Sequence, residues 1–277
     1  MRSVNTPAVV CQGLHIRFDR VTAVAPSNLI IPGTGVTAVI GANGSGKSSL
    51  LNAIAGLHPA ASGSISVLGE APEEISGRIA YVLQSTKVND ALPVTVREVV
   101  AMGRYASRGL LGRFQPSDLD RIDQALEALG LADISRSHLH ELSGGQRQRV
   151  FVAQGLVQDH DLLLLDEPRT ALDLVSTEVI TQAIDGERER GIPVVLTTHD
   201  MAEAREADHV VVMAGRVVAS GSPAETLTPQ VIAEAYGLPE DAFDQRVHVD
   251  DAAHNHEDEW HQHMDLSAHT HDHEERR

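Results

Sequence analysis

The segment Gly41-Ala42-Asn43-Gly44-Ser45-Gly46-Lys47-Ser48 matches the pattern G-x-x-x-x-G-K-[ST] without a gap. Glycines let the backbone curl so that successive N–H groups point at phosphate oxygens. A helix beginning near Lys47 adds its positive end, and the lysine ammonium can reach two phosphates. The chain has only two lysines, and one of them stands where this loop needs it. The stretch predicts a nucleotide-phosphate site rather than a chance glycine-rich turn.

Three apolar runs place this loop in a sheet. Val36–Ile40 precedes the loop, Leu162–Leu165 is followed by Asp166, and Val194–Thr198 is followed by His199. Short leucine-rich or β-branched runs predict buried parallel strands. The carboxyl ends of such strands meet at one edge of the sheet, where ligands bind in α/β folds.

The remaining patterns alternate between helical and extended. Leu119–Leu129 has helical spacing and ends at a glycine, and Thr95 with Glu98 has the spacing of a capping box. Val9–Ile31 and Gly63–Leu83 are strand-rich, and a hairpin is expected around Ala214-Gly215. The sequence therefore predicts an α/β fold.

Composition excludes several classes of protein. The 277 residues carry a net charge of −17, which opposes binding to nucleic acid or anionic lipid. A single cysteine excludes a disulfide framework. No apolar run exceeds five residues, far short of the roughly 20 that a spanning helix needs. Met1–Cys11 lacks the features of a signal peptide, so we expect a soluble cytoplasmic protein.

The pair Asp166-Glu167 supplies carboxylates at the end of an apolar run. Asp166 is suited to hold Mg²⁺ directly or through water, and Glu167 to polarise an attacking water as general base. An ordinary strand that meets a turn before Pro168 explains one of these carboxylates but not the pair together with the phosphate loop.

A second candidate anion site lies at Ser143-Gly144-Gly145-Gln146. Ser143 is a good helix N-cap, and the glycines leave N–H groups open at the start of a helix. One nucleotide does not need two phosphate cradles. A head-to-tail dimer, in which each chain closes the nucleotide site of the other, resolves this.

Over about residues 8–237 these motifs together resemble an ATP-binding subunit of the ATP-binding cassette (ABC) transporters. The resemblance implies a P-loop NTPase with an N-terminal antiparallel β-subdomain and an inserted helical subdomain at about 85–159, within a domain of residues 1–237. It implies an ATPase that uses Mg²⁺ and works with a membrane permease. The catalytic residues implied are Glu167, His199, Gln84 and Asp173, and the Mg²⁺ ligands are Ser48, Gln84 and Asp166. The nucleotide residues implied are Phe18, Gly41, Asn43, Gly44, Ser45, Gly46, Lys47, Ser48 and Ser49, with Ser143, Gly144, Gly145 and Gln146 of the other chain.

One residue departs from the family pattern. Arg169 stands where relatives commonly carry a smaller or apolar residue. Two interpretations are open: the side chain alters contacts in the dimer, or it simply lies at the surface.

Val88–Tyr105 and Val150–Ala153 resemble the corresponding segments of manganese, zinc and iron-chelate importers. We therefore expect the chain to power import of a divalent metal, zinc first and manganese second. It would act at the inner face of the cell membrane, with a solute-binding protein as indirect partner. The alternatives are an importer of iron chelates or another small solute, a P-loop metallochaperone, and a non-transport ABC ATPase. The metallochaperone needs N/T-K-x-D, which Thr86-Lys87-Val88-Asn89 does not complete.

The C-terminal tail, residues 238–277, differs in composition from the rest of the chain. From residue 248 onward it holds nine acidic residues, two basic residues and eight of the 15 histidines. So few apolar side chains predict disorder, or order only under some conditions. Imidazoles interspersed with carboxylates suit zinc, although a solvated acidic tail is the alternative. The candidate zinc ligands are His254, His256, His261, His263, His269, His271 and His273.

Overall fold

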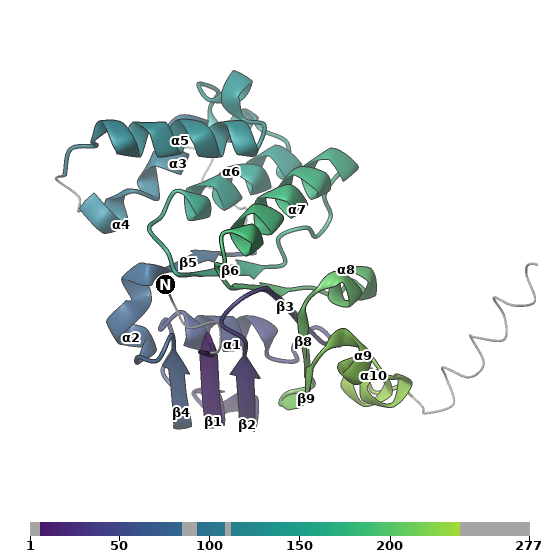
Figure 1. The fold of residues 1–277 in the computed structure, drawn as a ribbon. Helices are drawn as coiled ribbons and strands as arrows, with labels where there is room; N and C mark the ends of the chain where they lie inside the picture. The colour runs from purple at the N-terminus through teal and green to yellow at the C-terminus, as the bar shows by residue number, and fades with distance from the viewer. Residues whose placement is uncertain (1–5, 85–92, 109–111, 239–277) are drawn as a thin grey trace, which may run out of the picture. The chain divides into compact units, whose positions relative to one another are not determined.

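The structure, a computed structural model, describes residues 6–84, 93–108 and 112–238, and a six-stranded sheet lies at their centre (Figure 1). Its spatial order is β5-β6-β7-β3-β8-β9. The strands are β5 (Ile79–Val82), β6 (Leu162–Asp166), β7 (Val194–Thr197), β3 (Val36–Ile40), β8 (His209–Met213) and β9 (Val217–Gly221). All neighbours pair in parallel except β8 and β9, which form the hairpin predicted around Ala214-Gly215. Every residue of β3 and β6 is buried, as expected for strands covered on both faces.

A second sheet is antiparallel and has the order β2-β1-β4. Its strands are β1 (Val9–Phe18), β2 (Val21–Ile31) and β4 (Ser62–Val67). Apolar side chains of β1 and β2 share one core with α1 (Lys47–Ile54) and the central sheet. The antiparallel N-terminal sheet is confirmed. The strand-rich stretch from Gly63 is broken by the short helix α2 (Pro72–Ile75), which the strand pattern did not predict.

The helices between β5 and β6 fall within the range predicted for the helical insertion. They are α3 (Val96–Met102), α4 (Tyr105–Arg108), α5 (Pro116–Ala128) and α6 (Gly144–Leu156). Thr95 and Glu98 form the predicted capping box at α3. Leu119 has apolar spacing on α5 but is 42% exposed, whereas the apolar residues Ile122, Ala125 and Leu126 of the same helix are buried. The boundaries of the insertion and of the domain stay predictions.

A buried ion-pair cluster ties these helices together. The side chains of Arg104 and Asp118 are almost fully buried, and they pair at 2.9 Å. Arg108 pairs with the same carboxylate, and Arg104 also donates to the carbonyl of Val157 and to Asp159. The Arg108 guanidinium, the backbone N–H of Gln115 and then Arg104 hold the pKa of Asp118 well below its usual range. The charged carboxylate is therefore stabilised by folding.

The remaining helices follow the Asp166 strand and cover the central sheet. They are α7 (Leu174–Glu189), α8 (Met201–Glu206), α9 (Pro223–Thr226) and α10 (Pro229–Tyr236). Gly237, with φ of 64°, closes α10 in the left-handed conformation that glycine tolerates. Within the described ranges, no helix is both long enough and apolar enough to span a bilayer.

Candidate active site

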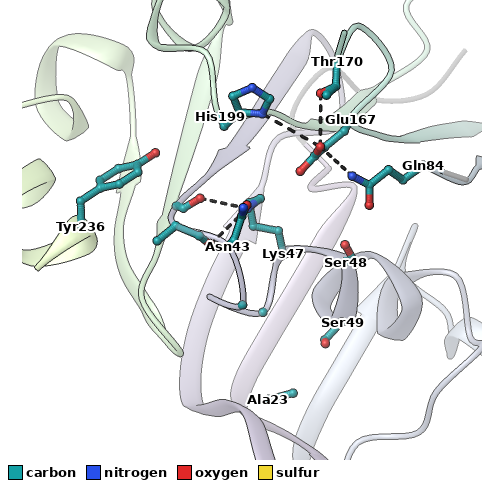
Figure 2. Close-up of a pocket in the computed structure, with 14 residues that line it drawn as sticks. Ala23, Asn43, Lys47, Ser48, Ser49, Gln84, Glu167, Thr170, His199 and Tyr236 are labelled. Carbon is teal, nitrogen blue, oxygen red and sulfur yellow. Dashed lines mark hydrogen bonds and ion pairs between the residues drawn. The ribbon is translucent and has the colours of Figure 1, made fainter.

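The phosphate loop joins β3 to α1 and borders a cavity of about 790 Å³ (Figure 2). Gly41 has φ of 150°, and a Cβ there would lie 2.2 Å from the carbonyl oxygen of Met213. A Cβ on Gly46, whose φ is 98°, would lie 2.6 Å from the carbonyl oxygen of Ala23. Only glycine fits either position, so the tight curl of the loop follows directly from its sequence.

The sequence brings most of its predicted nucleotide residues to this cavity. The predicted residues that line it are Gly41, Asn43, Gly44, Gly46, Lys47, Ser48, Ser49, Gln84, Glu167 and His199. Ala23, Ala42, Thr170 and Tyr236 also line it and were not predicted from the motifs. Tyr236 comes from α10, some 190 residues after the loop, and no local pattern marks it.

The phosphate loop holds a buried positive charge, the ammonium of Lys47. The Lys47 ammonium is almost fully buried and donates to the carbonyl oxygens of Gly41 at 2.9 Å and Ala42 at 3.3 Å. In the described part of the chain no carboxylate pairs with it. The Ser45 hydroxyl is buried without a hydrogen-bond partner there. A buried cation at a helix N-terminus, beside the loop glycines that line the cavity, fits the phosphates of a nucleotide.

The acidic edge of the site is organised by Thr197, at the end of β7. Register pairs Thr197 with Asp166 on β6. The Thr197 hydroxyl donates to the Asp166 carboxylate at 2.6 Å and accepts the backbone N–H of Glu167 at 2.8 Å. Asp166 is 4% exposed, so this carboxylate is held in place and suits a Mg²⁺ ligand. The apolar run alone could not identify Thr197, because its role depends on a neighbouring strand.

The carboxylate of Glu167 is surrounded by side chains from three segments (Figure 2). Its Oε2 accepts from Gln84 Nε2 at 2.7 Å and from Thr170 Oγ1 at 3.2 Å, and lies 4.0 Å from His199 Nδ1. Glu167 has a left-handed backbone, with φ of 49°, as does Ala171 with 57°. Such strain in non-glycine residues persists only where the surroundings enforce it, and it concentrates at functional sites.

The second glycine motif packs on the start of α7. Ser143 caps α6, with its Oγ accepting from the Gln146 N–H at 3.2 Å. Asp173 caps α7 by accepting from the N–H and hydroxyl of Ser176, and these bonds lower the pKa of Asp173. A Cβ on Gly145 would lie 2.6 Å from Asp173 Oδ2, so glycine is required for this approach. The structure thus brings Gly145 and Asp173 together, but Ser143–Gln146 does not line the cavity of its own chain.

Ser45, Asp166, Asp173 and Phe18 are predicted site residues that are not among the residues lining the cavity. Phe18 ends β1 and stacks on His58, with ring centroids 4.1 Å apart, and it does not line the cavity. Its contact with adenine therefore stays a prediction. The candidate zinc histidines of the tail lie outside the described residues.

Arg169 does not simply lie at the surface, so that interpretation is wrong. Its side chain is 10% exposed and pairs with Glu203 on α8, Nε to Oε1, at 2.9 Å. Its Nη1 also donates to the Thr181 hydroxyl on α7 at 2.9 Å.

Comparison with known proteins agrees with this site. The ABC transporter family matches residues 24–170. The zinc transport system ATP-binding protein TroB of Treponema pallidum is 35% identical over 259 residues, covering 89% of this chain and 97% of TroB. The manganese transport system ATP-binding protein MntB of Bacillus subtilis is 35% identical over 230 residues, covering 83% of this chain and 92% of MntB. The solved structure of cbiO1 from Clostridium perfringens, part of the ABC transporter complex cbiONQ, superposes with a TM-score of 0.70 at 26% identity, covering 88% of this chain and 99% of cbiO1.

The phosphate cradle, the paired carboxylates and the second glycine motif are therefore found in one sequence whose relatives power transport. The chain belongs to the ABC transporter family and is one of its ATP-binding, ATP-hydrolysing subunits.

Proposed function

We propose that this chain hydrolyses ATP in a head-to-tail dimer and powers import of a divalent metal through a separate permease. The observation that carries the ATPase site is the convergence of Gln84, Thr170 and His199 on the Glu167 carboxylate beside the Lys47 cradle. Zinc is the first candidate for the cargo and manganese the second.

Each residue of the site has a defined task in this proposal. Lys47 and the loop N–H groups bind the β- and γ-phosphates, and Asp166, Ser48 and Gln84 are the protein ligands for Mg²⁺. The bound ion neutralises charge that develops on the phosphate oxygens. Glu167 accepts a proton from the attacking water. His199, on the loop between β7 and α8, contacts the γ-phosphate.

The second copy of the chain supplies what the cavity lacks. The start of α6 carries open N–H groups after the Ser143 cap, yet it does not line its own cavity. Leu174 and Val175, next to Asp173, are 88% and 66% exposed. Apolar side chains this exposed beside a conformationally fixed cap favour contact with another protein surface. We propose that the nucleotide cavity of the second copy of the chain lies against Leu174, Val175 and the start of α6.

The permease docks, in this proposal, beside Gln84. A groove of about 240 Å³ is lined by Tyr81 and Leu83 of the β5 segment and by Phe151 and Gln154 of α6. Leu83 is 53% exposed and immediately precedes Gln84, which contacts Glu167. A helix of the permease seated here would act on the catalytic carboxylate through one residue. The chain would then lie at the inner face of the membrane, and a solute-binding protein would deliver the metal from the other side.

The relatives named for zinc and manganese transport support a divalent metal as cargo. The tail favours zinc, because imidazole is a good zinc ligand whereas manganese prefers carboxylate and water. We propose that His254, His256, His261, His263, His269, His271 and His273 bind zinc at several sites of modest affinity.

The test is uptake into membrane vesicles in which this chain is assembled with a permease partner. Zinc and manganese uptake should be measured for the wild type and for Glu167→Gln, with ATP on the side of the vesicle membrane where this chain is bound. ATP-dependent zinc uptake that the variant abolishes supports the proposal. Uptake of manganese alone reverses the order of cargo, and uptake of neither metal overturns metal import.

A second experiment tests the tail. Removal of residues 248–277 should leave ATPase activity intact and abolish most zinc binding in calorimetry. Equal zinc binding by the full-length and truncated chains overturns the proposal that the tail binds zinc.

A further inference from the structure

Arg169 lies on the loop that carries the Glu167 carboxylate, and its side chain contacts Thr181 and Glu203. It is two residues after Glu167 in a segment whose ends, Glu167 and Ala171, both have left-handed backbones. Such a segment needs fixed partners on either side to keep its conformation. Thr170 supplies one partner internally, by donating to the Glu167 carboxylate at 3.2 Å.

Arg169 connects this segment to other helices, first to α7 through Thr181. Its Nη1 donates to Thr181 Oγ1, and that hydroxyl donates in turn to the carbonyl oxygen of Thr177 on the same helix. The Thr181 hydroxyl is thereby fixed as an acceptor for the guanidinium. Arg169 is thus anchored on α7, one turn or more beyond the Asp173 cap.

The Nε atom of Arg169 pairs with Glu203 on α8, the helix that follows His199. Glu203 lies in the first turn of α8, and its side chain is 16% exposed in its ion pair with Arg169. The start of α8 is fixed by Asp200, which accepts from the N–H of Ala202 at 2.7 Å. His199 is the residue immediately before this cap. α8 therefore fixes the chain on one side of His199, and β7, which ends at Thr197, fixes it on the other.

We propose that Arg169 is a positioning residue that, through Glu203, fixes the separation between His199 and the Glu167 carboxylate. This rests on the proposed function, since it assumes that both groups act on the same γ-phosphate. The contact of Nε with Glu203 is an ion pair in which Nε makes no hydrogen bond, whereas Nη1 is hydrogen-bonded to Thr181, so one guanidinium links α8 to α7. Misplacement of a catalytic group by about 1 Å can cost on the order of 100-fold in rate.

The experiment is a double-mutant cycle on the full chain with Arg169→Met, Glu203→Gln and the two changes combined. Each single change leaves one mostly buried charge without its partner, so both should lower the melting temperature. The combined variant removes both charges and should regain much of that stability. We expect kcat to fall between about 10- and 100-fold in all three variants. The KM for ATP should stay within about twofold of wild type, because the phosphate cradle is untouched.

The combined variant separates positioning from stability. A purely structural pair would recover kcat together with the melting temperature, and that recovery would overturn the proposal. Wild-type kcat in Arg169→Met, or a loss in Arg169→Met that Glu203→Gln does not share, would also overturn it. ATP-dependent dimer formation, measured by sedimentation, should be unchanged, and its loss in Arg169→Met would assign the effect to the dimer instead.

Two further variants complete the design. Glu187→Gln removes another mostly buried carboxylate, whose partners His160 and Arg190 do not line the cavity. It should lower the melting temperature without changing kcat. Glu167→Gln distinguishes the two proposals: if it hydrolyses ATP at the wild-type rate, the assignment of Glu167 as the base in the proposed function fails. If it is inactive while Arg169→Met matches wild type, only the inference on Arg169 fails.

Discussion

Thr197, at the end of β7, donates a 2.6 Å hydrogen bond to Asp166, at the end of β6. The same hydroxyl accepts the backbone N–H of Glu167. One side chain therefore orients two consecutive acidic residues. Asp166 requires this donor because its carboxylate is buried, and the Glu167 backbone requires the acceptor to keep its left-handed conformation.

Thr197→Val tests this relationship with little change in volume. It leaves the Asp166 carboxylate and the Glu167 N–H each without a partner, at a cost of about 1–3 kcal/mol for each group. We expect ATPase activity to fall by about tenfold or more, because Asp166 and Glu167 lose the group that orients them and misplacement by about 1 Å can cost on the order of 100-fold in rate. Steady-state kinetics at varied Mg²⁺ concentration is the measurement. Thr37→Val, at a buried threonine on β3, is the matched control and should retain activity.

Glu167→Gln should bind ATP and lose about 10²–10⁴-fold in turnover, because the carboxamide keeps the shape but cannot accept a proton. The hydrogen bond from Gln84 has an oxygen acceptor in either residue, so the geometry should persist. Nucleotide binding by fluorescence, ATPase rate and dimer population should be compared with wild type. Hydrolysis at the wild-type rate would show that another group is the base.

Mixed dimers test the composite site. Ser143→Arg should leave ATP binding by its own chain intact, because Ser143 does not line that chain's cavity, and should disrupt only the site that it completes on the partner chain. A dimer that joins a Ser143→Arg chain to a Glu167→Gln chain has both lesions in one site and leaves the other site intact. It should retain about half of the wild-type activity, whereas a chain carrying both changes should spoil both sites when mixed with wild type. Full activity from a monomer in sedimentation contradicts the head-to-tail arrangement.

Asp118→Asn should destabilise the helical insertion, because Arg104 and Arg108 lose their shared charged partner. The expected drop in melting temperature is on the order of 5 °C or more. The pKa of Asp118 is depressed in the folded chain, so its contribution to stability is full above the unfolded pKa of about 4 and declines as pH falls below it. The melting temperature of wild type should therefore fall more steeply with acidification than that of Asp118→Asn.

Asp123→Asn is the control for this comparison. Asp123 also pairs with an arginine, Arg97, but its side chain is 54% exposed. Exposed ion pairs contribute little, so the melting temperature should hardly change. An equal drop in the two variants would contradict the assignment of stability to the buried cluster.

The motifs could be predicted from sequence because each is local. Gly41 and Gly46 are required by backbone approaches within one loop, and Ser143 caps the helix it begins. Thr197 and Tyr236 could not be identified, because their roles depend on a neighbouring strand and on a helix near the end of the domain. Arg169 was recognised as unusual, but only the packing of α8 shows which carboxylate it meets.

The hydrogen bond between Gln84 and Glu167 also bears on how much ATP the subunit consumes when it is not coupled to transport. Every contact described for that carboxylate falls on Oε2, and the shortest comes from Gln84. A subunit idling without its transporter meets ATP continually, and consumption of that ATP would move no cargo. While Gln84 holds Oε2, that bond sets the direction in which the second oxygen, Oε1, faces. The rate at which an idle subunit consumes ATP would then follow the position of Gln84, because that position orients the carboxylate that must meet water.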